Sequence, residues 1–358
     1  MSRRSRSRSL LVTGAGGVGK TTISAALANA AAQAGVRTLV LTVDPARRLA
    51  DALGLEHLGN DPTPVKGAPR LWAAMLDVTA SWEAIIHRHT DPEVAARLED
   101  NAFFRAIADR FPAAQAYAAG EQLAEYLEAG AWELVIVDTP PAGGGIDFYQ
   151  APGQMRELVG GRILRVMTGA GLPGRRALYR ITARPVLRIA DNVLGGALLQ
   201  EFTEFLMDLR TLYDGLARRA TNIEEYLRAS TTLVVTTANP TPLREARRFF
   251  EELEAVDSAP AAVVFNRALP NNWTLRDSDL TQELGPDLAS TILRDNFRRW
   301  AAEARRQREA REEFAAHFKV PLATVPWAEH PPTTLEALTG LMDVSDGLPD
   351  LAMVMPQK

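Results

Sequence analysis

The chain has 358 residues, of which 46% are hydrophobic and 23% charged, and this ordinary globular composition excludes collagen-like, coiled-coil and disordered classes. The formal net charge of −4 provides no strong positive field, so binding to nucleic acid or to an anionic membrane surface is not expected. There are no cysteines, which excludes disulfides, thiolate zinc sites and cysteine nucleophiles.

The start of the chain is basic and polar. Residues 1–8 alternate arginines with serines, so we expect a disordered basic tail; the alternative is a contact with an acidic partner. This tail lacks the apolar core of a signal peptide, and no run of about 18 apolar residues is present to span a bilayer. The sequence therefore predicts a cytoplasmic protein with no integral membrane segment.

Strands and helices alternate after the tail. An apolar run over 9–13 leads into a glycine-rich loop, and an alanine-rich helix is predicted over 21–34. Further buried strands are predicted at 37–43, 71–78, 134–137, 232–236, 262–265 and 320–325. Because helical patterns separate the strands, including a charged helix over 296–317, we expect an α/β fold with a doubly wound, mostly parallel sheet.

The helical patterns are concentrated in two long segments of the chain. Length alone allows either two domains or one large α/β domain with insertions. Because strands of the same character resume after the second segment, we predict a single domain over 9–345. A helical subdomain is expected to form from about 79–130 and 153–230, and a C-terminal tail from 346–358.

The glycine-rich loop matches a phosphate-binding motif. Residues 14–21 read GAGGVGKT, which fits the pattern G-x-x-x-x-G-K-[ST] in the strand, loop and helix context that the motif requires. The bare pattern arises by chance in about 1 in 100 chains of this length, before that context is counted. The sequence therefore predicts a P-loop ATPase.

The residue types explain how this loop would hold ATP and Mg²⁺. Glycines let main-chain N–H groups turn toward the phosphates, and the following helix directs its positive dipole end at them. The expected main-chain ligands are Gly14, Gly16, Gly17, Val18 and Gly19. Lys20 is expected to reach the β- and γ-phosphates, Thr21 to bind Mg²⁺ through its hydroxyl, and Thr22 to hydrogen-bond the α-phosphate.

Two carboxylates follow predicted strands. Asp44 (TVDPA) and Asp138 (VIVDTPP) lie where ligands of open α/β sheets bind, beyond the carboxyl ends of the strands. Asp138 is predicted to hold Mg²⁺ through water in a Walker-B role, and Asp44 to orient and polarise the attacking water beside the metal. The alternative for both is turn or helix capping, since Pro45 and Pro140 follow them.

At these residues the sequence resembles the ArsA/Get-type ATPases, a family that includes the arsenite-pump ATPase and the targeting factor for tail-anchored membrane proteins. The collinear matches are GAGGVGKTT at 14–22, TVDPARRLADALG at 42–54, DTPPAGGGIDFYQAP at 138–152 and VFNR at 264–267. The resemblance implies a deviant Walker A, SIMIBI-like P-loop fold with a helical subdomain.

The resemblance also implies roles for particular residues. Switch I would span 44–53, with Asp44 activating water, and switch II would span 138–145 and couple hydrolysis to the helical subdomain. Asn266 would recognise adenine, with Arg267 beside it and Pro326 packed on the base. The alternative for Asn266 is turn chemistry at the end of a strand.

The chain departs from the family pattern at the second residue of the loop. The family has a lysine there that reaches the partner subunit's nucleotide across a dimer, whereas this chain has Ala15. Either Arg47 or Arg48 replaces that lysine, or a paralogous subunit supplies it in a heterodimer rather than a homodimer. The alternative is that both arginines are solvated surface residues.

The missing cysteines also separate this chain from its relatives. Without them, neither arsenite nor zinc can be bound through cysteine. The Leu- and Met-rich segment 153–230 either forms a groove for a hydrophobic helix or membrane-protein client or is the subdomain's own core. The expected function is ATP-driven opening and closing of a dimer that handles such a client. The alternatives are a regulatory switch ATPase and the soluble subunit of a membrane anion pump.

Overall fold

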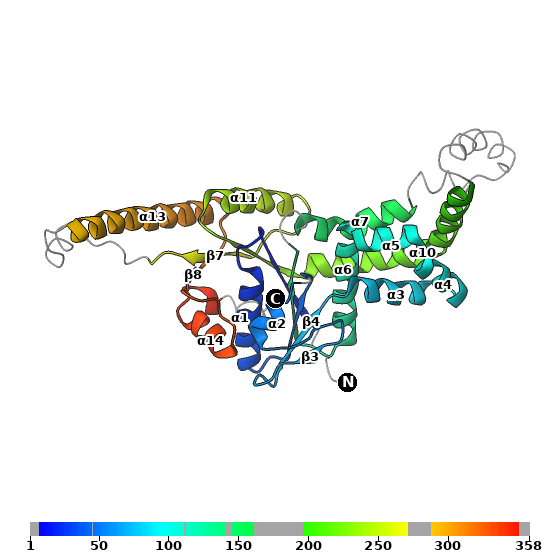
Figure 1. Cartoon of the computed structure of the whole chain (residues 1–358), viewed down its shortest axis with the longest axis horizontal. Helices are drawn as coiled ribbons and strands as arrows, with labels where there is room; N and C mark the ends of the chain where they lie inside the picture. Colours follow the sequence, from blue (N-terminus) through cyan, green and yellow to red (C-terminus); the bar gives the residue numbers. More distant parts are fainter. Residues whose placement is uncertain are drawn as a thin grey trace. The chain divides into compact units, whose positions relative to one another are not determined.

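The computed structural model describes residues 7–44, 46–110, 112–140, 145–160, 196–270 and 288–350. The chain divides into two compact units (Figure 1). Unit 1 consists of 1–75, 129–146 and 230–358, and unit 2 of 76–128 and 147–229. The single-domain organisation expected from the sequence stays a prediction.

Unit 1 contains a sheet of eight strands in the order β3-β4-β2-β5-β1-β6-β7-β8. The strands are β1 (Arg8–Thr13), β2 (Thr38–Thr42), β3 (Thr63–Pro64), β4 (Leu71–Met75), β5 (Leu134–Asp138), β6 (Thr231–Thr236), β7 (Ala262–Ala268) and β8 (Leu322–Pro326). All neighbours pair in parallel except β3, which is antiparallel to β4. The predicted α/β fold with a mostly parallel sheet is confirmed.

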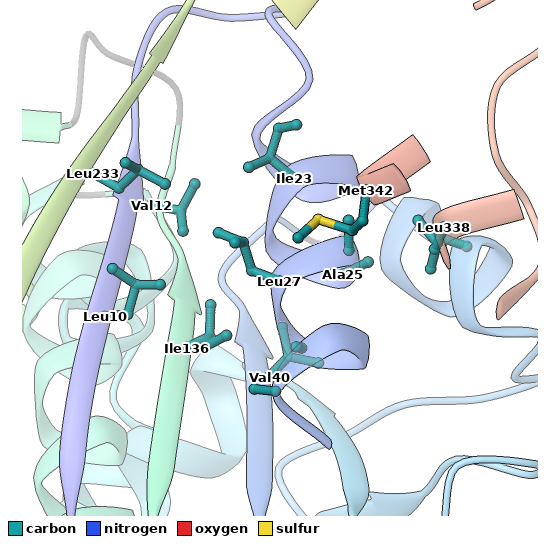
Figure 2. Close-up of a cluster of buried hydrophobic side chains, with 14 of the residues drawn as sticks. Leu10, Val12, Ile23, Ala25, Leu27, Val40, Ile136, Leu233, Leu338 and Met342 are labelled. Atoms are coloured by element: carbon teal, nitrogen blue, oxygen red, sulfur yellow. The ribbon is translucent and has the colours of Figure 1, made fainter. Parts of the chain in front are cut away.

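One face of this sheet packs against the helix that follows the glycine loop. The helices of unit 1 are α1 (Lys20–Gln33), α2 (Arg48–Leu53), α11 (Pro240–Glu254), α13 (Leu288–Phe318) and α14 (Leu335–Asp343). Figure 2 shows Leu10 and Val12 of β1 facing Ile23 and Leu27 of α1, with Met342 of α14 beside α1. The alternation along β1 therefore fixes α1, and the loop that precedes it, against the centre of the sheet.

The other face of the sheet is covered by α11 and α13 over its β6 to β8 side. Phe314 of α13 is fully buried and makes edge contacts with Phe265 of β7 at 5.7 Å and Phe250 of α11 at 5.2 Å between ring centroids. Such aromatic pairs stabilise a core beyond the area that they bury. This cluster anchors the C-terminal half of α13 to the sheet.

Unit 2 is built only of helices in its described residues. They are α3 (Val78–His89), α4 (Pro92–Asp100), α5 (Ala102–Arg110), α6 (Pro112–Ala129), α7 (Gly145–Gly160) and α10 (Gly196–Ala229). Trp82 stacks on Tyr117 at 5.7 Å, and the buried Glu121 accepts hydrogen bonds from Arg88 and Arg219. Among the described helices, none combines the length and the apolar character needed to cross a bilayer.

The apolar residues of α10 pack within unit 2. Phe205, Leu209, Leu212 and Leu216 are buried, whereas the Met207 side chain is 52% exposed. This pattern favours the interpretation of these residues as the core of the helical unit. Of the segment 153–230 considered for a client groove, residues 161–195 lie outside the described residues.

Several predicted boundaries were wrong. The strand expected over 71–78 ends at Met75, because Asp77 caps α3 by accepting a hydrogen bond from the Ala80 N–H at 3.0 Å. The basic tail ends before Arg8, which pairs with Leu134, and 1–6 lie outside the described residues.

The C-terminal boundary was also wrong. Residues 346–350 do not form a tail, because Asp346 and Thr324 exchange main-chain hydrogen bonds and Leu348 is fully buried. Residues 351–358 lie outside the described range. The charged helix expected over 296–317 is longer in the structure, where α13 runs from Leu288 to Phe318.

Candidate functional site

The glycine loop connects the central strand β1 to the N-terminus of α1. Gly14 has φ +145°, and a Cβ there would lie 2.0 Å from the carbonyl oxygen of Val235 on β6. Gly19 has φ +98°, and a Cβ there would lie 2.1 Å from Nδ2 of Asn266. Both positions therefore require glycine, because a side chain would collide with the neighbouring strands in a backbone conformation that L-residues avoid.

The middle of the loop is open. Gly16 and Gly17 are exposed, Val18 is buried, and a Cβ at Gly17 would have no described residue within 4 Å. No acidic residue lies in the first turn of α1, whose unpaired N–H groups make a helix start attractive to anions. Gly14 to Gly19 can thus present main-chain donors to an incoming phosphate.

Lys20 lies at the first position of α1 with only 8% of its surface exposed. Its Nζ donates to the carbonyl oxygens of Gly14 and Ala15, both at 3.0 Å. Burial lowers the pKa of Lys20, while the negative charges of Asp138 and Asp44 raise it. An ammonium has three donors, so one N–H of Lys20 remains for a ligand within the loop.

Asp138 ends β5 next to the loop and is almost fully buried. Its Oδ2 accepts hydrogen bonds from the Thr21 hydroxyl at 2.7 Å and the Thr42 hydroxyl at 3.0 Å, whereas its Oδ1 has no hydrogen-bond partner among the described residues. Burial raises the pKa of Asp138 to about 6, and the two hydroxyl groups and Lys20 oppose that shift. A buried carboxylate oxygen without a partner is costly unless a ligand completes it.

The donor set at Asp138 suits Mg²⁺. The hydroxyl of Thr21 and the carboxylate of Asp138 are hard oxygen donors, which Mg²⁺ prefers together with water and phosphate oxygens. Among the described residues there is no group of three or more His, Asp or Glu side chains able to hold a metal ion. A metal here would therefore depend on Thr21, Asp138, water and the nucleotide.

Asp44 follows β2, whose last residue Thr42 is in register with Asp138. The Asp44 carboxylate accepts a hydrogen bond from the Ala46 N–H at 2.9 Å and lies 3.7 Å from the Arg48 guanidinium, with 25% of the side chain exposed. Asp44 therefore caps its own turn, as the alternative interpretation expected. It also stands at the same edge of the sheet as Asp138.

The arginines considered as replacements for the family's lysine occupy different positions. Arg48 pairs with Asp44, with 67% of its side chain exposed. Arg47 is exposed and donates to the carbonyl oxygen of Glu56. Ala15 itself is buried, with 5% of its surface exposed. Of the two arginines, only Arg48 contacts a predicted site residue.

Asn266 lies near the end of β7 with 8% of its surface exposed. Its Nδ2 donates to the carbonyl oxygen of Val18 at 2.8 Å, and its Oδ1 accepts from the Arg267 N–H at 2.9 Å. Arg267 is exposed and has φ +56°, and Pro326 ends β8 beside Ala268. The β7 end therefore touches the glycine loop directly.

The structure brings most of the predicted site residues together at one edge of the sheet. Thr22 is half-buried in the first turn of α1, next to Thr21. Of the expected switch II, residues 141–144 lie outside the described residues. Thr42, whose hydroxyl donates a hydrogen bond to Asp138, was not predicted as a site residue. Its position at the end of a buried strand was the signal that could have indicated it.

The fold and the loop define a P-loop protein, and comparisons identify its family. Residues 7–281 match the model of the anion-transporting ATPase family, which is more than half of the chain. The chain therefore belongs to this family of ATPases, which confirms the resemblance found in its motifs.

Similar proteins come from archaea, bacteria and fungi. A Halobacterium salinarum protein, provisionally named arsenical pump-driving ATPase, is 28% identical over 58% of this chain and 33% of its own length. An uncharacterized Streptomyces coelicolor protein is 34% identical over 51% of this chain and 50% of its own length. ATPase GET3 of Rhodotorula glutinis is 25% identical over 74% of this chain and 71% of its own length. The chain thus spans a third to a half of the first two relatives.

Proposed function

We propose that the protein is a Mg²⁺-dependent ATPase. The observation that supports this most is the Asp138 carboxylate beside an open glycine loop: its Oδ2 accepts from the Thr21 hydroxyl, and its Oδ1 has no hydrogen-bond partner in the part of the chain that the structure describes. In the proposal, the loop's N–H groups and Lys20 bind the β- and γ-phosphates, Thr22 the α-phosphate, and Thr21 and Asp138 hold the metal ion. Mg²⁺ supplies neutralisation of the charge that develops on the phosphates.

The attacking water is assigned to Asp44. Its carboxylate is partly exposed and neighbours Asp138 through the register of β2 and β5, so it can accept a proton and lie near the metal ion. Arg48 pairs with this carboxylate at 3.7 Å and leaves it 25% exposed, so water can reach it. The adenine is assigned to the other side of β1, where Asn266, Arg267 and Pro326 lie at the ends of β7 and β8.

The proposed output is nucleotide-controlled opening and closing of a dimer. Because Ala15 cannot supply a charge, either Arg48 or Arg47 completes the site in a homodimer, or a paralogous subunit completes it in a heterodimer. A hydrophobic helix or membrane-protein client is proposed from the resemblance of the motifs to the ArsA/Get-type ATPases, and ATPase GET3 of Rhodotorula glutinis is among the relatives. We also propose a cytoplasmic location, as expected from the sequence.

Two alternatives rest on separate observations. The buried α10 residues Phe205, Leu209, Leu212 and Leu216 favour a regulatory switch ATPase whose output is its dimer state, because they pack inside unit 2. The name of the Halobacterium relative favours a soluble subunit of a membrane anion pump. Both alternatives retain the same nucleotide chemistry.

The proposal is tested with the purified full chain. Calorimetry should detect MgATP binding that is weaker without Mg²⁺, and phosphate release should be lost in Lys20→Ala. Asp44→Asn should bind ATP without hydrolysing it. Light scattering of this variant with ATP should then give the mass of a dimer. Pull-down with this variant from native lysate distinguishes a helix client, a related subunit and a transporter. A folded protein without MgATP affinity would contradict the proposal.

A further inference from the structure

A chain of hydrogen bonds connects α13 to the ends of two strands beside the glycine loop. Gln307 on α13 has 8% of its surface exposed, and its Oε1 accepts a hydrogen bond from the Leu269 N–H at 3.2 Å, just after β7. Its Nε2 donates to Oε1 of Glu303 at 3.0 Å. Because both the oxygen and the nitrogen of this buried amide are hydrogen-bonded, Gln307 holds the backbone after β7 in one position.

The same chain continues from Glu303 to the end of β6. Arg306 donates to both carboxylate oxygens of Glu303, at 2.5 and 2.8 Å. Its guanidinium also donates to the carbonyl oxygen of Ala238, at 3.3 and 3.4 Å. The hydrogen bonds from Arg306 lower the pKa of Glu303, so this carboxylate stays ionised at neutral pH. The loops after β6 and β7 are thus joined through one turn of α13.

Both loops begin next to residues that touch the glycine loop. Ala238 comes three residues after Val235, whose carbonyl oxygen faces Gly14. Leu269 comes three residues after Asn266, whose amide binds the Val18 carbonyl oxygen. Any shift of these loops would therefore move the β6 and β7 side of the nucleotide site.

The positions of the charged groups indicate which part of a nucleotide lies on that side. Asp138 ends β5 and Asp44 follows β2, both on one side of β1. These carboxylates suit the metal ion that would accompany the terminal phosphate. With the phosphates held by the loop, the base then extends over β6 and β7. Main-chain groups and amides, which Asn266 and the Leu269 region provide, are the groups that read the edge of a base.

We propose that Gln307, Glu303 and Arg306 are positioning residues for the base, acting through the backbone after β6 and β7. This inference rests on the proposed ATP site and deepens it, because it assigns base affinity and base selectivity to α13. The phosphate-binding loop is joined directly to β1 and α1, which flank it, so the contributions to phosphate binding and to base binding can be measured apart.

The test compares MgATP, MgGTP and magnesium tripolyphosphate, which lacks a base, by calorimetry on the full chain. Gln307→Met keeps the length of the side chain but removes both hydrogen bonds. Losing one such bond should weaken ATP binding about three- to tenfold and reduce the preference for ATP over GTP. Tripolyphosphate binding should change less than about twofold. The matched control is Glu309→Met, on the exposed surface of the same helix, which should change none of these affinities.

A second variant tests the inference independently if Gln307→Met does not fold. Arg306→Met removes a side chain that is 42% exposed, and it should show the same loss that is specific to nucleotides with a base. Equal losses for ATP and tripolyphosphate, or unchanged ATP affinity in both folded variants, would overturn the inference while leaving the ATPase proposal intact. A wild-type chain that binds neither ligand would overturn the ATPase proposal, and the inference with it.

Discussion

Replacing Gly19 with alanine tests the contact between the glycine loop and β7. The new Cβ would lie 2.1 Å from Nδ2 of Asn266, in a backbone with φ +98°. The left-handed backbone costs an L-residue about 1–2 kcal/mol, and losing the Asn266 hydrogen bond to Val18 costs about 0.5–1.5 kcal/mol more. Gly19→Ala should therefore lower the free energy of unfolding by about 1.5–3.5 kcal/mol in total.

Gly17 provides the matched control within the same loop. It also has a positive φ, of +75°, but a Cβ there meets no described residue within 4 Å. Gly17→Ala should therefore show the backbone cost alone, about 1–2 kcal/mol. Both losses are below the ~5–15 kcal/mol stability of ordinary domains, so both variants should fold.

Urea unfolding and MgATP titration of the two variants give the readout. Gly19→Ala should be the less stable variant and should lose the thermal stabilisation that MgATP gives, because displaced Asn266 no longer fixes the Val18 backbone. In an Asn266→Ala background the collision is absent, so adding Gly19→Ala should cost only the backbone term. Equal destabilisation by Gly17→Ala and Gly19→Ala, or no relief in that background, would refute the reasoning.

Four further variants test the site and the core. Asp138→Asn should reduce phosphate release at least about a hundredfold, because it removes a metal ligand, with circular dichroism unchanged; near-normal turnover would contradict the Asp138 assignment. Arg48→Ala should alter the ATPase rate if Arg48 serves the site through Asp44, whereas Arg47→Ala removes the contact with Glu56 and should leave the rate unchanged. Unchanged rates in both variants would reject the hypothesis that an arginine replaces the family's lysine. Phe314→Ala should lower the free energy of unfolding by about 3–5 kcal/mol in urea, since the ring is fully buried, and a loss below about 1 kcal/mol would contradict its role in the core.

Local sequence patterns were sufficient where the interacting residues are neighbours in the chain. The loop motif at 14–21 predicted a strand, a turn and a helix, and β1 and α1 occupy those positions. The position of Asp138 at the end of an apolar strand predicted a place near the loop, and in the structure Asp138 is in register with Val12, two residues before Gly14. In both cases one stretch of chain carries both the pattern and the chemistry.

Element ends were predicted less well, since capping and long-range pairing decide them. Apolar residues continue past Met75, but the Asp77 side chain caps α3 and ends the extended segment. The short β3 has too few residues to show a pattern, and it exists through pairing with β4. Asp346 likewise belongs to the fold only through its bridge to Thr324.

By itself, the sequence determined the class of fold, the phosphate loop and the residue types able to hold a triphosphate and a metal ion, because each is written in a short contiguous pattern. Only the tertiary structure decided that Asn266 closes on Val18, that Thr42 shares the Asp138 carboxylate and that Gln307 holds Leu269. These partners lie 248, 96 and 38 residues apart in the chain. Contacts at such separations arise from strand order and helix packing, to which no local pattern is sensitive.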